Sequence, residues 1–140
     1  MEQIVKARYS AAATAQGGRG GQVTSADGVV DLPLGKPGST ANPKANPETL
    51  FAAGYAACFG GALNLIASQE GLDTSDSTVT ADVTLGDTGT GAGLAVDIEA
   101  RIPGVDDATA QRLVDAAHQM CPYSKATRGN IGVTVTGLAA

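Results

Sequence analysis

The chain has 140 residues and a net charge of −5, with 43% hydrophobic residues, 4% aromatic residues, 19 glycines and no tryptophan. A nucleic-acid-binding protein needs a basic face, so this acidic chain, whose lysines and arginines are scattered, is predicted to bind neither DNA nor RNA. The length predicts one domain, residues 1–140, with an aliphatic core. No apolar run approaches the roughly 18 to 20 residues of a membrane span, and the start lacks the features of a secretory signal. We therefore expect a cytoplasmic protein with no membrane partner and with reduced thiols.

The N-terminal part is predicted to form a three-stranded meander. Ile4–Ala15 alternates enough to be a strand, and Asp27-Gly28 is a strong hairpin signal between the next two strands. The glycine-rich stretch "GGRGG", residues 17–21, is expected to be a flexible turn that presents Arg19. It lacks the spacing of a dinucleotide-binding loop and the lysine of a P-loop, so a phosphate site is disfavoured. Lys36–Pro47 is predicted to be a loop.

The first helix is predicted to begin at Asn46-Pro47, because asparagine is a favoured N-cap and proline a favoured first helical residue. Glu48 falls in the first turn, where the helix dipole stabilises an acid. The apolar pattern continues to Ile66, and Gly71 is a plausible end. Glycines inside a helix each cost about 1 kcal/mol relative to alanine, which suggests close approach by another backbone and hence a central helix. These glycines are Gly54, Gly60 and Gly61.

The second half of the chain is predicted to form a hairpin, a helix and a final strand. Ser77–Asp87 and Gly93–Gly104 alternate apolar and polar residues, and a glycine-rich turn joins them. Asp106–Met120 is predicted to be a helix with acidic capping that stops at Pro122, and Asn130–Gly137 alternates as a strand. The order three strands, helix, two strands, helix, strand indicates an α+β fold rather than strict βαβ alternation.

His118 and the nearby acids are weak candidates for chemistry. A Cys–His nucleophile pair is conceivable, but a histidine near the C-terminus of a helix is also favoured by the dipole. Asp106, Asp107 and Asp115 are expected to cap and solvate the helix. A zinc site usually needs four ligands, and two cysteines with one histidine fall short, so no metal is predicted.

Cys58 and Cys121 can be inert core residues or a reactive pair. Cysteine is among the most buried residue types, so packing alone explains either position. Three features favour reactivity: these are the only two cysteines, each occupies a predicted helix, and the "CPYS" segment places polar groups beside Cys121 at a helix end. Both interpretations remain open from the residues alone.

A nucleophilic Cys58 must be a thiolate near neutral pH. It lies about three turns into its helix, beyond the reach of the helix dipole, so Arg19 is the natural group to stabilise the charge. A desolvated guanidinium needs a carboxylate partner, and Glu48 is the nearest acid. Glu48 and Cys58 are about 15 Å apart along a straight helix. Either Arg19 spans part of this distance, the helix bends, or Glu48 comes from a second copy, so we favour a homodimer with composite sites.

Two segments, "NPETLFAAGYAACFGGAL" and "CPYSKATRGNIGVTV", resemble the OsmC/Ohr family, and within it the organic hydroperoxide resistance branch. The "GGRGG" turn and the "SADG" hairpin match in order and spacing, so the resemblance covers nearly the whole chain, although "PETL" replaces a common "PEQL". It implies an α+β fold in the order βββαββαβ, with two helices packed with antiparallel sheets in an intertwined homodimer. It also implies that the protein holds no metal and no bound organic cofactor.

The resemblance implies a thiol peroxidase that reduces organic hydroperoxides, including those of fatty acids, to alcohols. Cys58 would be the peroxidatic thiol and Cys121 the resolving thiol, with Arg19 activating Cys58 and Glu48 orienting Arg19. Cys58 would pass through a sulfenic acid to a Cys58–Cys121 disulfide. A dihydrolipoyl group on a lipoylated protein, or another dithiol, would then reduce that disulfide.

Four aromatic residues are candidate walls of a substrate pocket, although core packing is at least as good an explanation for each. They are Phe51, Tyr55, Phe59 and Tyr123. Two other functions stay open: a redox-sensing or binding module that uses the cysteine pair without turnover, and a structural domain with two buried thiols.

Overall fold

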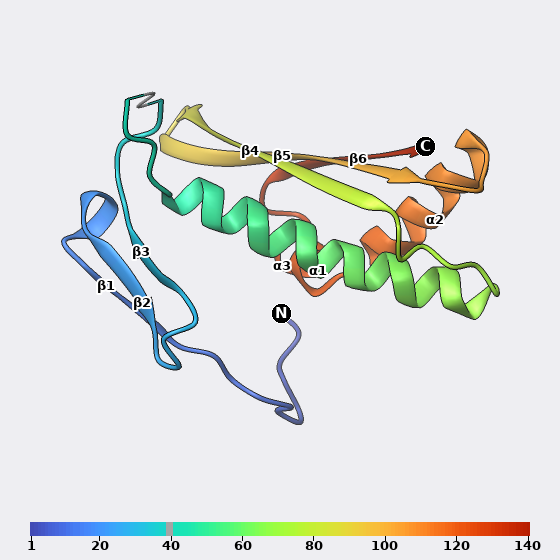
Figure 1. Ribbon diagram of the computed structural model, residues 1–140, viewed down its shortest axis with the longest axis horizontal. Coiled ribbons are helices and arrows are strands. Elements are labelled where there is room, and N and C mark those ends of the chain that lie inside the picture. The colour runs from blue at the N-terminus through green and yellow to red at the C-terminus, as the bar shows by residue number, and fades with distance from the viewer. Residues whose placement is uncertain (39–40) are drawn as a thin grey trace. The chain divides into compact units, whose positions relative to one another are not determined.

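The computed structural model describes residues 1–38 and 41–140 in two compact units, Met1–Pro47 and Glu48–Ala140 (Figure 1). The predicted loop Lys36–Pro47 includes Ser39 and Thr40, which lie outside the described residues. The single domain inferred from chain length stays a prediction.

The first unit contains a three-stranded antiparallel sheet in the order β1-β2-β3, which confirms the predicted meander. Its strands are β1 (Ala13–Gln16), β2 (Gln22–Ser25) and β3 (Asp31–Pro33). The strand predicted over Ile4–Ala15 is too long, because the four residues of β2 pair only with Ala13–Gln16 and the preceding residues form no strand. Gly28 has a φ of 76° in the β2–β3 turn, as the Asp27-Gly28 signal requires.

The glycine-rich turn between β1 and β2 is a short 3-10 helix, η1 (Gly18–Gly20), which carries Arg19. Gly17 and Gly18 have positive φ angles of 78° and 61°, a region that other residues rarely adopt. A Cβ atom at Gly21 would lie 1.7 Å from the carbonyl oxygen of Gln16. The backbone therefore requires glycine here, whereas the sequence suggested only flexibility.

The helix α1 (Pro47–Gln69) starts where predicted and ends just before Gly71. All of it except its first residue belongs to the second unit. Its buried residues face the core: Tyr55, Phe59, Ala62, Leu63 and Ala67. Its length and composition would allow it to cross a membrane, so the expectation that no apolar run has such a length is wrong. The fully buried side chains of Tyr55, Phe59 and Leu63 instead make it a core helix of this unit.

Within the described part of the chain, the atoms nearest to an added Cβ at the glycines of α1 belong to side chains rather than to another backbone. A Cβ atom at Gly54 would meet the hydroxyl oxygen of Tyr123 at 3.0 Å, which is a side-chain contact. At Gly60 the nearest atom would be a methyl group of Val79 at 3.7 Å, and nothing lies within 4 Å at Gly61. The helix is central in this unit through its large buried side chains, and a close approach of another copy to its glycines stays a prediction.

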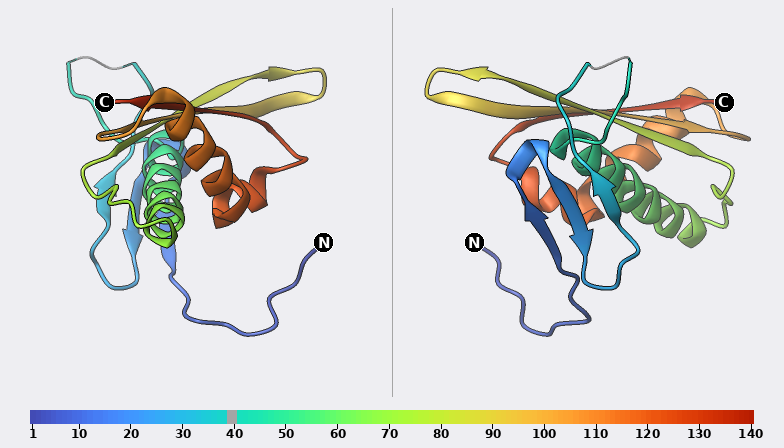
Figure 2. Two further views of the ribbon diagram at one scale, coloured as in Figure 1. Left: turned by 90° about the vertical axis from the view of Figure 1, so that its right-hand side faces the viewer. Right: turned by 60° about the vertical axis from the view of Figure 1, so that its left-hand side comes forward.

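The second sheet, in the order β4-β5-β6, is mixed rather than antiparallel. Its strands are β4 (Thr78–Thr88), β5 (Gly91–Ile102) and β6 (Gly132–Ala139). β4 and β5 form the predicted antiparallel hairpin, but β6 runs parallel to β5. Parallel neighbours need a crossover connection, and α2 (Asp107–Met120) and α3 (Pro122–Thr127) supply it. Figures 1 and 2 show α1, α2 and α3 on the same face of this sheet.

The short helix α3 was not predicted. Pro122 was expected to end the preceding helix, and α2 does end at Met120. The proline then occupies the first position of a new helix, where its missing N–H costs nothing. Cys121 is therefore the single residue that links α2 to α3, with a non-helical ψ of 124°.

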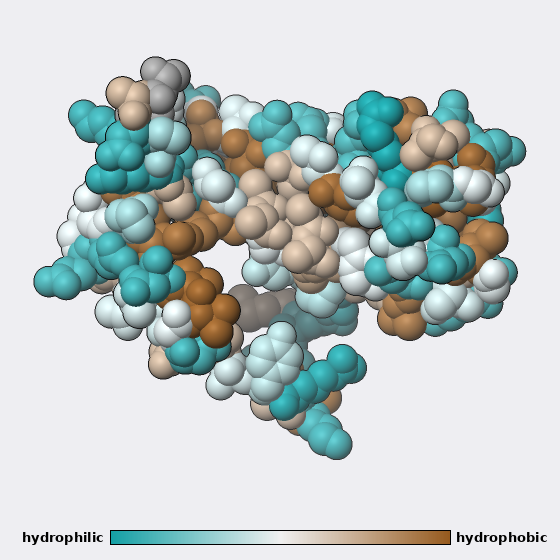
Figure 3. Space-filling model, viewed as in Figure 1, coloured by the Kyte–Doolittle hydropathy of each residue, from teal (hydrophilic) through white to brown (hydrophobic). Residues whose placement is uncertain are grey.

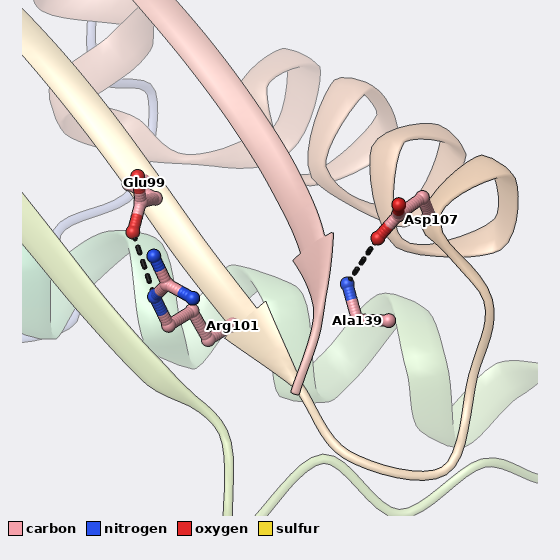
Figure 4. Close-up of polar contacts among 4 residues, drawn as sticks. All are labelled: Glu99, Arg101, Asp107 and Ala139. Atoms are coloured by element: carbon pink, nitrogen blue, oxygen red, sulfur yellow. Dashed lines mark hydrogen bonds and ion pairs between the residues drawn. The ribbon is translucent and has the colours of Figure 1, made fainter.

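The ends of α2 are anchored by specific contacts. The carboxylate of Asp106 accepts a hydrogen bond of 2.8 Å from the backbone N–H of Thr109, which confirms the predicted acidic cap. Asp107 accepts a 2.7 Å bond from the backbone N–H of Ala139 and ties the start of α2 to the end of β6 (Figure 4). A Cβ atom at Gly137 would lie 2.4 Å from the carbonyl oxygen of Ala110, so α2 and β6 are in close backbone contact.

The core of the second unit lies between the sheet and the three helices. Along β5, Val96, Ile98, Ala100 and Ile102 are buried, while Asp97 and Arg101 are exposed. This alternation is the period of two expected for a sheet with one covered face. On the open face, Arg101 forms an ion pair of 2.8 Å with Glu99 (Figure 4).

Candidate active site

The two cysteines, 63 residues apart in sequence, meet in the second unit. Cys58 lies on α1 and is half-buried, whereas Cys121 lies between α2 and α3 and is fully buried. Their sulfurs are 3.5 Å apart, and both are free thiols. A disulfide has an S–S length of about 2.05 Å, so an approach of about 1.5 Å would join them. The structure thus brings together the two residues predicted to react with each other.

Burial is the main influence on Cys58 and raises the pKa of its thiol above the ordinary value. The contact with Cys121 raises this pKa further, whereas a hydrogen bond with the backbone of Tyr123 lowers it. The surroundings of Cys58 in the second unit therefore favour the neutral thiol on balance. A cationic group is the natural means of reversing this preference.

The predicted activating residues lie on different units. Arg19 is on η1 in the first unit, and Glu48 is in the first turn of α1 and half-buried. Both residues take part in interactions within the structure. Their roles toward Cys58 stay predictions.

Three of the four aromatic candidates form one cluster beside the cysteines. The ring of Tyr123 stacks on Phe51 at a centroid distance of 6.1 Å, and the ring of Tyr55 lies 5.7 Å from Phe51 and 5.6 Å from Tyr123. Tyr55 and Phe59 are fully buried core residues, whereas Phe51 is half-buried and Tyr123 is 38% exposed. Phe51 and Tyr123 are therefore the two candidates that are not fully buried, and a role for any of the four in substrate binding stays a prediction.

A buried network of hydroxyl groups lies next to the cysteine pair, and the sequence reasoning missed it. The Ser124 hydroxyl is 2.8 Å from Nδ1 of His118 and 2.9 Å from the hydroxyl of Tyr55. The Tyr55 hydroxyl is also 3.0 Å from Oγ1 of Thr127. The sequence identified Ser124 only as one of the polar residues in "CPYS". No local pattern indicates that this serine, on a short helix, is buried.

His118 contributes to this network from the last turn of α2. Burial is the main cause that lowers its pKa, and the positive charge of Arg128 acts in the same direction. The structure therefore pairs a neutral imidazole with Ser124 near neutral pH. Within residues 1–38 and 41–140, no group of three histidine, cysteine or acidic side chains is placed to hold a metal ion.

Comparison with known proteins gives one consistent result. The sequence pattern of the family described as OsmC-like protein matches residues 38–136. An organic hydroperoxide resistance protein from Xanthomonas axonopodis pv. citri is 47% identical over 140 residues, covering 97% of this chain and 99% of the relative. The organic hydroperoxide resistance protein OhrB from Bacillus subtilis is 44% identical and covers 91% of this chain and 96% of its own.

Solved structures agree with the sequence relatives. The crystal structure of an organic hydroperoxide resistance protein from Elizabethkingia anophelis superposes with a TM-score of 0.89 at 47% identity, covering 97% of this chain and 100% of that one. The structure of Bacillus subtilis OhrB has a TM-score of 0.87 at 43% identity, with coverage of 96% and 100%.

Proposed function

Because this chain belongs to the OsmC/Ohr family, in its organic hydroperoxide resistance branch, we propose that it is a cysteine-based peroxidase that reduces organic hydroperoxides to alcohols. The names of its relatives support a role in resistance to organic hydroperoxides and in protection against oxidative stress. Fatty-acid hydroperoxides are the proposed natural substrates. The cytoplasm, with its reducing thiol pools, is the proposed compartment.

The observation that carries the proposal is the 3.5 Å separation of the Cys58 and Cys121 sulfurs. Two inert core cysteines have no need to meet, whereas a peroxidatic and a resolving thiol must. The difference in exposure also suits the roles, since half-buried Cys58 can meet a peroxide while buried Cys121 cannot.

In the proposed reaction, the Cys58 thiolate attacks one peroxide oxygen. The O–O bond breaks, an S–O bond forms, and the leaving alkoxide takes a proton to become the alcohol, which leaves Cys58 as a sulfenic acid. The Cys121 thiolate then attacks the sulfenic sulfur, forming the S–S bond and breaking the S–O bond, and the hydroxide leaves as water after taking a proton. An external dithiol, such as a dihydrolipoyl group on a protein, reduces the disulfide by exchange and is itself oxidised to a disulfide.

Arg19 is the proposed source of the positive charge that Cys58 needs, with Glu48 as its carboxylate partner. A guanidinium favours the thiolate and can also hydrogen-bond to the peroxide oxygens. Burial raises the pKa of the Cys58 thiol and so favours its protonated form at neutral pH. The positive charge of Arg19 would lower this pKa and favour the thiolate.

The proposed assembly is a homodimer. One side of α1 is exposed along its length and carries mostly small residues at every fourth position. These residues are Thr49, Ala53, Ala57, Gly61 and Leu65. Small side chains let helices approach closely, and the apolar surface over α1 is visible in Figure 3. This face is the proposed contact with a second copy.

A thiol-titration experiment tests the function. The reduced protein is mixed with cumene hydroperoxide, the loss of free thiol is followed, and dihydrolipoamide is then added. Repeated cycles of oxidation and recovery are expected for a peroxidase. One oxidation without turnover would indicate a redox sensor instead, and no loss of thiol would indicate a structural protein.

Variants of the cysteines test the roles. Cys58→Ser is expected to abolish peroxide consumption. Cys121→Ser is expected to allow one turnover and then to accumulate sulfinic or sulfonic acid at Cys58, detectable by mass spectrometry. An active Cys58→Ser protein would overturn the assignment.

A further inference from the structure

The link between α2 and α3, where Cys121 lies, is bridged by hydrogen bonds that join residues on either side. The imidazole Nδ1 of His118, three residues before Cys121, is 2.8 Å from the hydroxyl of Ser124, three residues after it. Arg128 donates a further bond of 2.7 Å to the carbonyl oxygen of His118. The backbone at Cys121 leaves the helical conformation, so these bonds hold an otherwise hinge-like position.

The Ser124 hydroxyl also joins this link to α1. It lies 2.9 Å from the hydroxyl of Tyr55, and both residues are fully buried. Tyr55 precedes Cys58 by three residues on α1, so the two lie on neighbouring positions of one helix face. The Tyr55–Ser124 contact and the Cys58–Cys121 contact therefore join the same two segments at adjacent points.

We propose that Ser124 is a positioning residue for both reactive sulfurs: through Tyr55 and His118, its hydroxyl holds Cys121–Tyr123 against Cys58. This inference rests on the proposed peroxidase function and names a residue that acts through the cysteines without touching the peroxide.

Two separate contacts of Cys58 depend on this arrangement. The first is the hydrogen bond with the backbone of Tyr123, which acts against the effect of burial and favours the thiolate. The second is the 3.5 Å approach of the Cys121 sulfur, which sets how readily the sulfenic acid is resolved. Removing the hydroxyl leaves His118 and Tyr55 without this buried partner. The Cys121–Tyr123 segment then loses a buried hydrogen bond to α1 and is held there by the ring contacts of Tyr123 with Phe51 and Tyr55.

The test uses Ser124→Ala and Tyr55→Phe, each of which removes one hydroxyl from the full-length protein. Alkylation of Cys58 by iodoacetamide is measured against pH, and disulfide formation is timed after addition of the thiol oxidant diamide. We expect the alkylation midpoint to rise in both variants. The disulfide should form at least about fivefold more slowly, because each variant loses both hydrogen bonds of the removed hydroxyl and one such bond corresponds to about fivefold. Ser124→Thr, which keeps the hydroxyl, should restore both.

The matched control is Thr74→Val. It removes a buried hydroxyl of the loop after α1 that is bonded at 2.6 Å to Asn64 on α1, the helix that also carries Cys58. It is expected to lower the melting temperature without changing the alkylation midpoint or the disulfide rate. The proposal is overturned if Ser124→Ala leaves both quantities unchanged, or if Thr74→Val changes them equally, since Ser124 would then contribute only to general stability.

These readouts are independent of peroxide turnover. If the wild-type protein fails to consume organic hydroperoxides, the proposed function fails, while the alkylation and diamide measurements still show whether Ser124 positions the thiols. If turnover is normal in Ser124→Ala and both readouts match wild type, only the positioning role fails.

Discussion

At the scale of single residues, Cys58 combines partial exposure with surroundings that favour its neutral form. Burial raises the pKa of its thiol, and the contact with Cys121 raises it further. A thiol with a raised pKa is mostly protonated at neutral pH, and its reactivity increases as the pH rises through that pKa. A nucleophilic role therefore depends on an added positive charge, which we assign to Arg19.

This assignment predicts how removal of the arginine changes the pH dependence of Cys58. In Arg19→Ala, the midpoint of iodoacetamide alkylation at Cys58 is expected to lie above that of an ordinary thiol, because burial is then unopposed by the guanidinium. In the wild type the midpoint is expected at lower pH, and Cys58 should be alkylated before buried Cys121. Peptide mass spectrometry across a pH series measures both.

The control for this measurement is Arg101→Ala, which removes the same charge from an exposed arginine on the open face of the second sheet. It should leave the wild-type midpoint unchanged. Identical midpoints in Arg19→Ala and wild type would contradict the activating role of Arg19 while leaving that of Cys58 intact.

At the scale of elements, the parallel crossover from β5 through α2 to β6 depends on one close contact. Gly137 on β6 faces the backbone of α2 so closely that a Cβ atom would lie 2.4 Å from the carbonyl oxygen of Ala110. Backbone cannot give way as a flexible side chain can, so α2 must shift away from the sheet if this glycine gains a side chain. Cys121 directly follows α2, so such a shift would also reach the site.

Gly137→Ala is accordingly expected to destabilise the fold by about 1–3 kcal/mol, the usual cost of overpacking. Gly132→Ala on the same strand is the matched control, because nothing lies within 4 Å of its added Cβ atom. Urea unfolding of the two variants measures the difference. Equal stabilities would contradict the close backbone contact between β6 and α2.

At the scale of the whole molecule, the exposed face of α1 predicts an assembly. Gly61 lies in this face, and an added side chain would meet nothing within 4 Å in the chain itself. Gly61→Glu should therefore leave the protomer folded but place a charge in the proposed contact between two copies, where burial of an unpaired charge is unfavourable. Analytical ultracentrifugation is expected to give a dimer for the wild type and a monomer for this variant.

Gln119→Glu adds the same charge at an exposed position on α2 rather than on α1 and should remain dimeric. Dissociation of both variants would point to a general charge effect, and a stable Gly61→Glu dimer would place the contact elsewhere. A wild-type monomer with full activity would exclude the composite sites that we propose.

Several elements could be predicted because their signals are local. Asn46-Pro47 marked the start of α1, Asp106 marked the cap of α2, and alternation marked β4 and β5. The helix α3 was missed because a proline that ends one helix can also begin the next. The direction of β6 was missed because alternation is the same in parallel and antiparallel strands.

By itself the sequence determined the α+β class, the order of most elements and, through its two cysteine motifs, the family. Periods of two and 3.6 residues, caps and motifs are properties of neighbouring residues and can be recognised without a partner. Only the tertiary structure decided that the sulfurs of Cys58 and Cys121 lie 3.5 Å apart and that Ser124 joins Tyr55 to His118 beside them. Such distances between residues remote in the chain depend on how α1, α2 and α3 pack on one sheet, and no local pattern encodes that packing.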